Sequence, residues 1–199
     1  FQPSGVEPRN GDFYYITYKY SKQDFQTRIY QKLKTIEANF GKTSAENRVT
    51  LSAYLMIANG ALLVGIKQVK KVPNTSQASD QSFIDAIQSL STPLPGGIKP
   101  DVIMPLATST SVYAQLTQHV ETMSLIQNQA ERMGFIGFAS GTQSTAAGAV
   151  ASALNSSRII AVYPDSAVIT LSDDNGQDFE SLVDGTFLAS AVIGAIVSP

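Results

Sequence analysis

Apolar and polar positions follow two different periods along the chain, and each period predicts one kind of element. Runs rich in β-branched and aromatic residues predict strands, and apolar residues at helical spacing predict helices. The expected strands are Asp12–Tyr20, Phe25–Tyr30, Ala61–Val69, Asp101–Leu106, Phe135–Ala139, Arg158–Tyr163 and Ala167–Leu171. The expected helices are Lys32–Phe40, Thr43–Ala58, Ser79–Leu90, Ser109–Arg132, Gly141–Leu154 and Thr186–Val197.

Start and stop signals support these boundaries. Gly41 follows the first helical pattern at the position where a helix commonly ends. Thr43 and Glu46 have capping-box spacing, and Asn59-Gly60 predicts a break. The expected loops and turns are Asn74–Ser79, Ser91–Pro100 and Ser172–Asp178.

The order of the elements predicts the fold class. Strands alternate with helices from Ala61 to Tyr163, which is typical of an α/β protein with a covered sheet. We expect a largely parallel or mixed sheet flanked by helices, with an N-terminal antiparallel strand element. Residues 1–31 form the expected N-terminal strand or hairpin segment, and residues 32–199 form the expected core domain. One helical stripe faces that core at Val112, Leu116, Val120, Met123 and Ile126.

Composition excludes several classes of site. The 199 residues contain no Cys and one His, so disulfides, iron–sulfur clusters and thiolate zinc sites are excluded. The net charge of −2 gives the molecule no general attraction to nucleic acid or to an anionic membrane. Only 15% of residues are charged, so the polar surface is largely uncharged and costs little to bury against neighbours. This pattern suits assembly, although an ordinary neutral surface also fits it.

Charge is divided between the two halves. Residues 1–100 carry 12 Lys and Arg against 7 Asp and Glu, while residues 101–199 carry 2 against 9. Copies would attract head to tail if the halves lie at opposite ends, and the division means little if they interleave. The candidate subunit contacts are Lys67, Lys70 and Lys71 on one side and Asp173, Asp174 and Asp178 on the other. The alternative for the lysines is a solvated strand end.

The best candidate for a ligand site is the turn Ser140-Gly141-Thr142, between an expected strand and an expected helix. Free N–H groups at a helix start can hold an anion, so a small-molecule or anion-binding domain is the alternative function. Simple helix capping also explains these residues. The glycine spacing fits no dinucleotide fingerprint, and Ser140 lacks the flanking glycines of a nucleophile elbow.

The remaining motifs do not complete a site. Gly41-Lys42-Thr43 lacks the P-loop glycine, because Ile36 stands at its position. The Asp-Asp-Asn-Gly turn would place Leu171 and Leu182 where a calcium loop needs carboxylates. His119 lies in a helical stripe, so we expect a partly buried or surface helix residue rather than a catalytic base. We therefore expect no enzyme activity, no catalytic residues, no cofactor and no metal.

The chain ends give expectations about context. It begins at Phe1 without Met and ends just after an apolar helical pattern, so we expect a fragment or processed product. The apolar stretch Val49–Ile66 is broken by Asn59-Gly60, and Phe187–Val197 is too short to cross a bilayer. A soluble, non-membrane protein is expected.

Four segments resemble contractile tail sheath proteins of bacteriophages, and the style of the chain resembles giant phages of the φKZ type. Gly11–Tyr20 is similar to the aromatic strand of that family, and Lys34–Gly41 to its short helix ending in aromatic-glycine. Arg158–Pro164 resembles its strand ending in Tyr and Pro. Val183–Pro199 resembles the segment that leads into the family's C-terminal domain, so the resemblance implies a fragment that stops before that domain.

The resemblance implies an α/β subunit of a helical sheath around a tail tube. Contraction of such a sheath drives the tube through the host envelope without nucleotide hydrolysis. The implied partners are other copies of the chain and the tail tube protein, without nucleic acid, membrane insertion or a small-molecule substrate. The implied location is the virion, after synthesis in the host cytoplasm. A polysaccharide-binding module that uses the N-terminal tyrosines is a further alternative.

Overall fold

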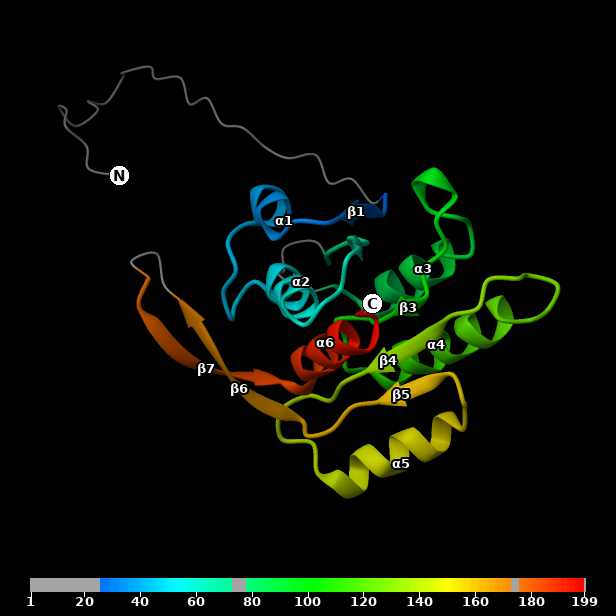
Figure 1. The fold of residues 1–199 in the computed structure, drawn as a ribbon. Coiled ribbons are helices and arrows are strands. Elements are labelled where there is room, and N and C mark those ends of the chain that lie inside the picture. The colour runs from blue at the N-terminus through cyan, green and yellow to red at the C-terminus, as the bar shows by residue number, and fades with distance from the viewer. Residues whose placement is uncertain (1–25, 73–77, 173–175, 199) are drawn as a thin grey trace, which may run out of the picture.

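The computed structural model describes residues 26–72, 78–172 and 176–198, which fold into a mixed α/β structure (Figure 1). The strands are β1 (Arg28–Tyr30), β2 (Val64–Ile66), β3 (Val102–Ile103), β4 (Met133–Ile136), β5 (Ile159–Ala161), β6 (Ser166–Ser172) and β7 (Asp178–Asp184). The helices are α1 (Leu33–Phe40), α2 (Arg48–Ala58), α3 (Asp80–Ser89), α4 (Thr110–Met123), α5 (Ser144–Leu154) and α6 (Gly185–Ile196). A short 3₁₀ turn, η1, spans Pro95–Gly97.

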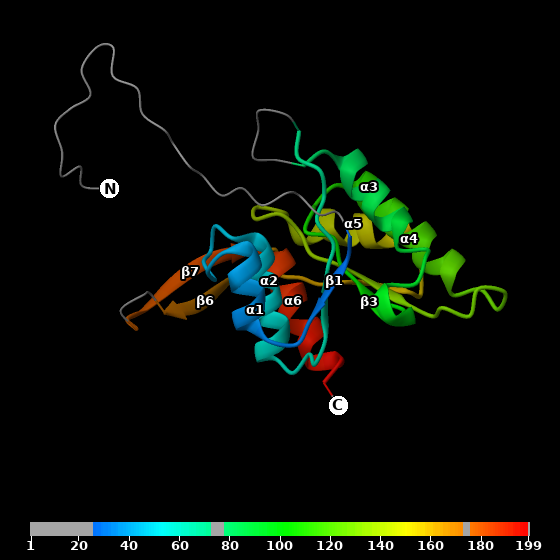
Figure 2. The same ribbon diagram turned by 90° about the horizontal axis from the view of Figure 1, so that it is seen from above.

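A parallel sheet of order β3-β4-β5 lies between the helices. Successive side chains of β4 point to opposite faces, so Phe135 packs on α6 while Ile136 packs on α4. Helices α3, α4 and α5 cover one face of the sheet, and α6 covers the other (Figures 1 and 2). The mixed α/β fold expected from the element order is confirmed.

Helix α6 connects the sheet to the rest of the molecule, because α2 packs on its other side. Small residues allow the two helices to approach closely. A Cβ atom at Gly194 would lie 2.3 Å from the Met56 carbonyl oxygen, so only glycine fits this crossing. The buried hydroxyls of Ser52 and Ser190 form a hydrogen bond with each other across this helix contact, at 2.9 Å.

The N-terminal layer is a separate antiparallel pair, β1–β2, covered by α1 and α2. Ile29 pairs with Gly65, and Tyr30 pairs with Val64. Tyr30, Val64 and Ile66 are buried against α1 and α2, so the opposite face of the pair points outward. The strand expected over Ala61–Val69 thus forms, but it is shorter and lies outside the parallel sheet.

A second antiparallel pair, the β6–β7 hairpin, projects from the body (Figure 1). Ala167, Ile169, Leu171 and Val183 pack on α2 and α6. The sequence predicts no element over residues 179–184, so β7 is an addition to the expected fold, and Asp178, expected in the turn, begins this strand. A strand forms there because Val183 and Leu171 bury their side chains in the same cluster as Phe187.

Three helix boundaries differ from the prediction by three residues or more. The capping box at Thr43 does not form, because the Thr43 hydroxyl donates to the Glu37 carboxylate at 2.8 Å. Helix α2 instead begins after Asn47, whose side chain caps the Thr50 N–H. Helix α4 ends at Met123 rather than at Arg132, and Ile126 stands 91% exposed beyond it.

Helix α5 begins at Ser144 after Gln143 rather than at Gly141, so Ser140 and Thr142 do not cap it. The caps at Gly41 and Ser79 agree with the sequence. Gly41 adopts a positive φ of 94° just after α1, and Ser79 caps α3 through the Ser82 N–H. The strand expected over Asp12–Tyr20 and most of the loop Asn74–Ser79 lie outside the described residues.

Candidate interaction surfaces

The outer face of the β6–β7 hairpin combines an apolar pair with acidic residues. Val168 and Leu182 face each other in the register and are 61% and 67% exposed. Asp178 and Glu180 alternate with Leu182 along β7, so they lie on the same outer face and are exposed. Exposed apolar side chains beside charges are typical of contact surfaces. We call this the hairpin face.

The hairpin also has open edges. Within the described residues β6 and β7 pair only with each other, so each strand has one edge without a strand partner. Such edges present unpaired N–H and C=O groups that can accept another strand.

The root of the hairpin is fixed to the body by Arg48. Its guanidinium lies 2.6 Å from an oxygen of Asp184 and 4.9 Å from the centre of the Phe187 ring. The other oxygen of Asp184 accepts the Thr186 N–H at 3.0 Å and thereby caps α6. Asp184 therefore joins β7, α6 and α2 at one point.

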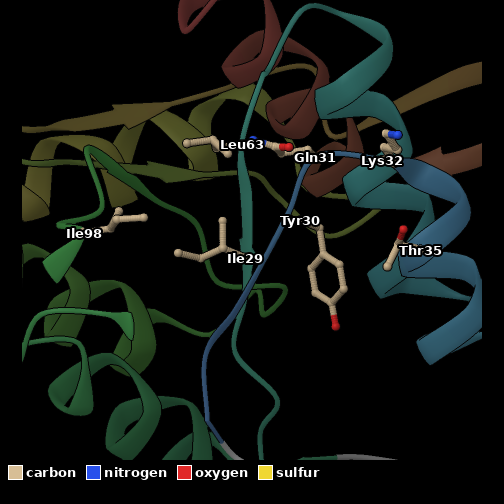
Figure 3. Close-up of a pocket in the computed structure, with 7 residues that line it drawn as sticks. All are labelled: Ile29, Tyr30, Gln31, Lys32, Thr35, Leu63 and Ile98. Atoms are coloured by element: carbon tan, nitrogen blue, oxygen red, sulfur yellow. The ribbon is translucent and has the colours of Figure 1, made fainter. Parts of the chain in front are cut away.

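A shallow hollow of about 440 Å³ lies at the outer side of the β1–β2 pair (Figure 3). Its lining comes from β1, the start of α1, the segment before β2 and the loop before β3. The lining residues are Ile29, Tyr30, Gln31, Lys32, Thr35, Leu63 and Ile98. Leu63 and Ile98 are exposed apolar residues. No motif in the sequence indicates the hollow, because these segments meet only in the fold.

The predicted basic cluster follows β2. Lys67 is half-buried, and Lys70 and Lys71 are exposed. Asp178 is exposed and accepts the Ser172 hydroxyl at 2.6 Å, whereas Asp173 and Asp174 lie outside the described residues. Helices α1 and α2 lie between the hairpin and β1–β2 in both views (Figures 1 and 2). One molecule thus does not bring the described members of the two groups together, and their contact between copies stays a prediction.

The turn Ser140–Thr142 follows β4, as expected, but Gly141 and Thr142 already have hydrogen-bond partners. The Gly141 N–H donates to the Asp165 carboxylate at 2.5 Å, and the Thr142 hydroxyl donates to the Ala139 carbonyl at 2.6 Å. A carboxylate therefore occupies one of the N–H groups on which an anion would depend, and its negative charge repels a second anion.

His119 is buried rather than at the surface, in a pair that the sequence did not reveal. Its Nε2 accepts a hydrogen bond from the Arg132 guanidinium at 2.8 Å. The same guanidinium nitrogen donates a hydrogen bond to the Leu90 carbonyl oxygen at 2.9 Å. Burial and the Arg132 charge lower the pKa of His119 from 6.5 to about 4. The neutral imidazole therefore holds α4 to the segment before β4 and to the end of α3, which is a structural task.

The described residues show neither a metal-binding cluster nor a membrane-spanning helix. They contain no group of three or more His, Cys, Asp or Glu side chains placed to hold a metal ion. None of their helices combines the length and the hydropathy needed to cross a membrane.

The chain matches no protein-family model and no curated protein.

Proposed function

We propose that the chain is a structural subunit of a contractile bacteriophage tail sheath, which assembles around the tail tube and contracts to drive it through the host envelope. The observation that carries the proposal is the hairpin face, an exposed apolar and acidic surface that projects from the body. Three segments that resemble sheath proteins supply α1, β5 and the end of β7 with α6.

The separation of charge supports assembly by a head-to-tail contact. The acidic hairpin face and the basic cluster after β2 occupy different places on the molecule, with α1 and α2 between them (Figures 1 and 2). A contact between unlike surfaces leaves one free surface of each kind, so it propagates into a helical filament when it does not close into a ring.

The proposed function needs no catalytic step. Contraction would be a change between two packings of the same interfaces, since packed interfaces are bistable rather than continuously deformable. A rigid root at Arg48 and Asp184 would transmit the movement of a docked hairpin to α2 and α6.

Negative-stain electron microscopy and sedimentation velocity test the proposal. The chain, and any longer protein that contains it, is concentrated over a range of salt. Tubes of uniform width in two states of different diameter are expected from a contractile sheath. Dispersed small particles under every condition, for both proteins, would contradict it.

A thermal-shift panel of nucleotides and inorganic anions tests the alternative. A ligand that binds tightly at Ser140–Thr142 would raise the melting temperature by mass action. We expect no rise, because Asp165 already accepts the Gly141 N–H. A rise that vanishes in Thr142→Val, with no tube formation, would favour the ligand-binding function instead.

A further inference from the structure

Two small antiparallel sheets in this molecule expose outer faces of opposite chemistry. The hairpin face has the apolar pair Val168 and Leu182 beside Glu180 and Asp178. The outer face of β1–β2 has Leu63 and Ile29 at the hollow, followed by Lys67. We propose that the hairpin face of one copy packs on the outer face of β1–β2 of a second copy. This contact rests on the proposed function, because it names the partner of the assembly surface.

The apolar parts of the two faces fit each other. Leu182 and Val168 form a ridge of adjacent side chains, whereas Ile29, Leu63 and Ile98 line a shallow hollow (Figure 3). Burying these exposed apolar side chains against an apolar surface is favourable in proportion to the area removed from water. The hollow is shallow and lined mainly by uncharged groups, which suits a side-chain ridge.

The charged parts lie at the same spacing from the apolar parts on both faces, but in opposite chain directions, so the two strands would dock antiparallel. Along β7, Asp178 lies four residues from Leu182, and in the segment that contains β2, Lys67 lies four residues from Leu63. Four extended residues span about 13 Å, so a hairpin with Leu182 at Leu63 can reach Lys67 with Asp178. Lys70 and Lys71 continue the basic track, and the predicted acidic turn lies beyond Asp178.

Glu180 and Lys32 are further exposed charges of opposite sign beside the two apolar parts. Lys32 lines the hollow and is exposed, as is Glu180 between Leu182 and Asp178. Within the part of the chain that the structure describes, neither side chain makes an ion pair. Both are therefore available for a charge contact between copies, which favours correct pairing over random apolar association.

Gly65 lies between the apolar and the basic part of the β1–β2 face. It is exposed, pairs with Ile29, and presents no side chain, so a second sheet can approach closely. A Cβ atom added there would meet only the Thr27 methyl group, at 3.8 Å, which is an ordinary contact. A larger residue at this position therefore leaves the fold intact and obstructs a docked sheet.

Disulfide trapping tests the contact directly, because the native chain has no Cys. Leu182→Cys is mixed with Leu63→Cys under mild oxidation, and the matched control mixes Leu182→Cys with Ile126→Cys, a fully accessible position. We expect cross-linking in the first mixture to be at least about tenfold faster. Equal rates, or faster self-cross-linking of Leu182→Cys alone, would overturn the contact between unlike faces.

Gly65→Gln supplies the second measurement. We expect unchanged thermal unfolding and an association constant about tenfold weaker, measured by sedimentation. A folded variant that associates normally would overturn the proposal. If tubes form but neither test succeeds, this contact is wrong and the sheath function stands. If no assembly forms at all, the proposed function fails with it.

Discussion

Arg132 places a positive charge beside His119 in the interior. Arg132 is 3% exposed and His119 is 5% exposed, and carbonyl oxygens of Leu90 and Ala130 accept the guanidinium. Burial lowers the pKa of Arg132, while the Asp101 carboxylate raises it. A second cation on the imidazole would meet both burial and repulsion, so the ring stays neutral in the folded protein.

We expect this pair to make stability depend on pH. The unfolded chain binds a proton at His119 near pH 6.5, whereas the folded protein binds it only near pH 4. The stabilisation is therefore complete above pH 6.5 and is lost as the pH falls towards 4. At 1.36 kcal/mol per pKa unit, the upper limit is about 3 kcal/mol. Urea unfolding from pH 7.5 to pH 4 measures the slope.

His119→Gln is the control for that slope, because the Gln carbonyl can still accept from Arg132 but does not titrate. The difference in unfolding free energy between the two proteins should shrink as the pH falls from 6.5 to 4. Parallel curves would show that His119 titrates normally in the fold.

Gly194 is a residue whose lack of a side chain decides a helix crossing. In Gly194→Ala the new Cβ would lie 2.3 Å from the Met56 carbonyl oxygen and 2.9 Å from the Asn59 Cβ. Helices α2 and α6 must then separate, which we expect to cost about 1–3 kcal/mol in unfolding free energy. Gly148→Ala in α5 is the matched control, because nothing lies within 4 Å of its Cβ position. We expect it to stabilise the protein by up to about 1 kcal/mol, and a loss of equal size in both variants would refute the crossing argument.

At the scale of elements, the sequence predicted helices better than strands. The Val112, Leu116 and Val120 stripe is fully buried, because helical periodicity reports directly which face meets a core. The short strands depend on partners far along the chain, so β1 and β2 are an isolated pair rather than part of the parallel sheet. Alternative hydrogen bonds also change a predicted cap. The Thr43 hydroxyl donates to the Glu37 carboxylate, so Asn47 rather than Thr43 caps α2.

The candidate surfaces were predictable only in their charges. Lys67, Lys70, Lys71 and Asp178 stand out in the sequence as charged clusters. The hollow could not be predicted, because Ile98 meets Ile29 and Leu63 only through the arrangement of three segments. The partner of the Ser140–Thr142 turn was equally hidden, since Asp165 arrives from beyond β5.

The hairpin root gives a prediction about how β7 and α6 are joined. Asp184→Asn keeps an oxygen to cap the Thr186 N–H but loses the ion pair with Arg48, whereas Asp184→Ala loses both. We expect Asp184→Asn to lower the free energy of unfolding by about 1 kcal/mol, because the ion pair is partly exposed. Asp184→Ala should lower it by about 1 kcal/mol more, because the helix cap is also lost. Urea unfolding of both variants checks this order. If Asp184→Asn costs as much as Asp184→Ala, the cap contributes nothing.

At the scale of the whole molecule, the acidic and basic groups that are separate in the sequence are also separate in the fold. The acidic hairpin face and the lysines after β2 lie apart, with α1 and α2 between them (Figure 2). Attraction between them is therefore intermolecular and screened by salt, since the Debye length falls from about 10 Å at 0.1 M to about 3 Å at 1 M. Self-association driven by this contact should weaken as salt is raised.

Charge reversal of Lys67, Lys70 and Lys71 to Glu tests that attraction. These lysines would face Asp178 and Glu180 of a neighbouring copy, so the reversal replaces attraction by repulsion. We expect association at least about tenfold weaker at physiological salt and short or absent tubes in negative stain. Normal tube length under these conditions would refute the electrostatic contact.

A matched pair of variants separates this contact from the effect of net charge. Changing the three lysines to Gln lowers the net charge of −2 by three, and so does changing Ser144, Thr145 and Ser152, exposed on α5, to Glu. General repulsion between like-charged molecules would weaken association equally in both. A specific contact predicts that only the lysine variant weakens, and that its loss disappears at 1 M salt, where the native contact is itself screened.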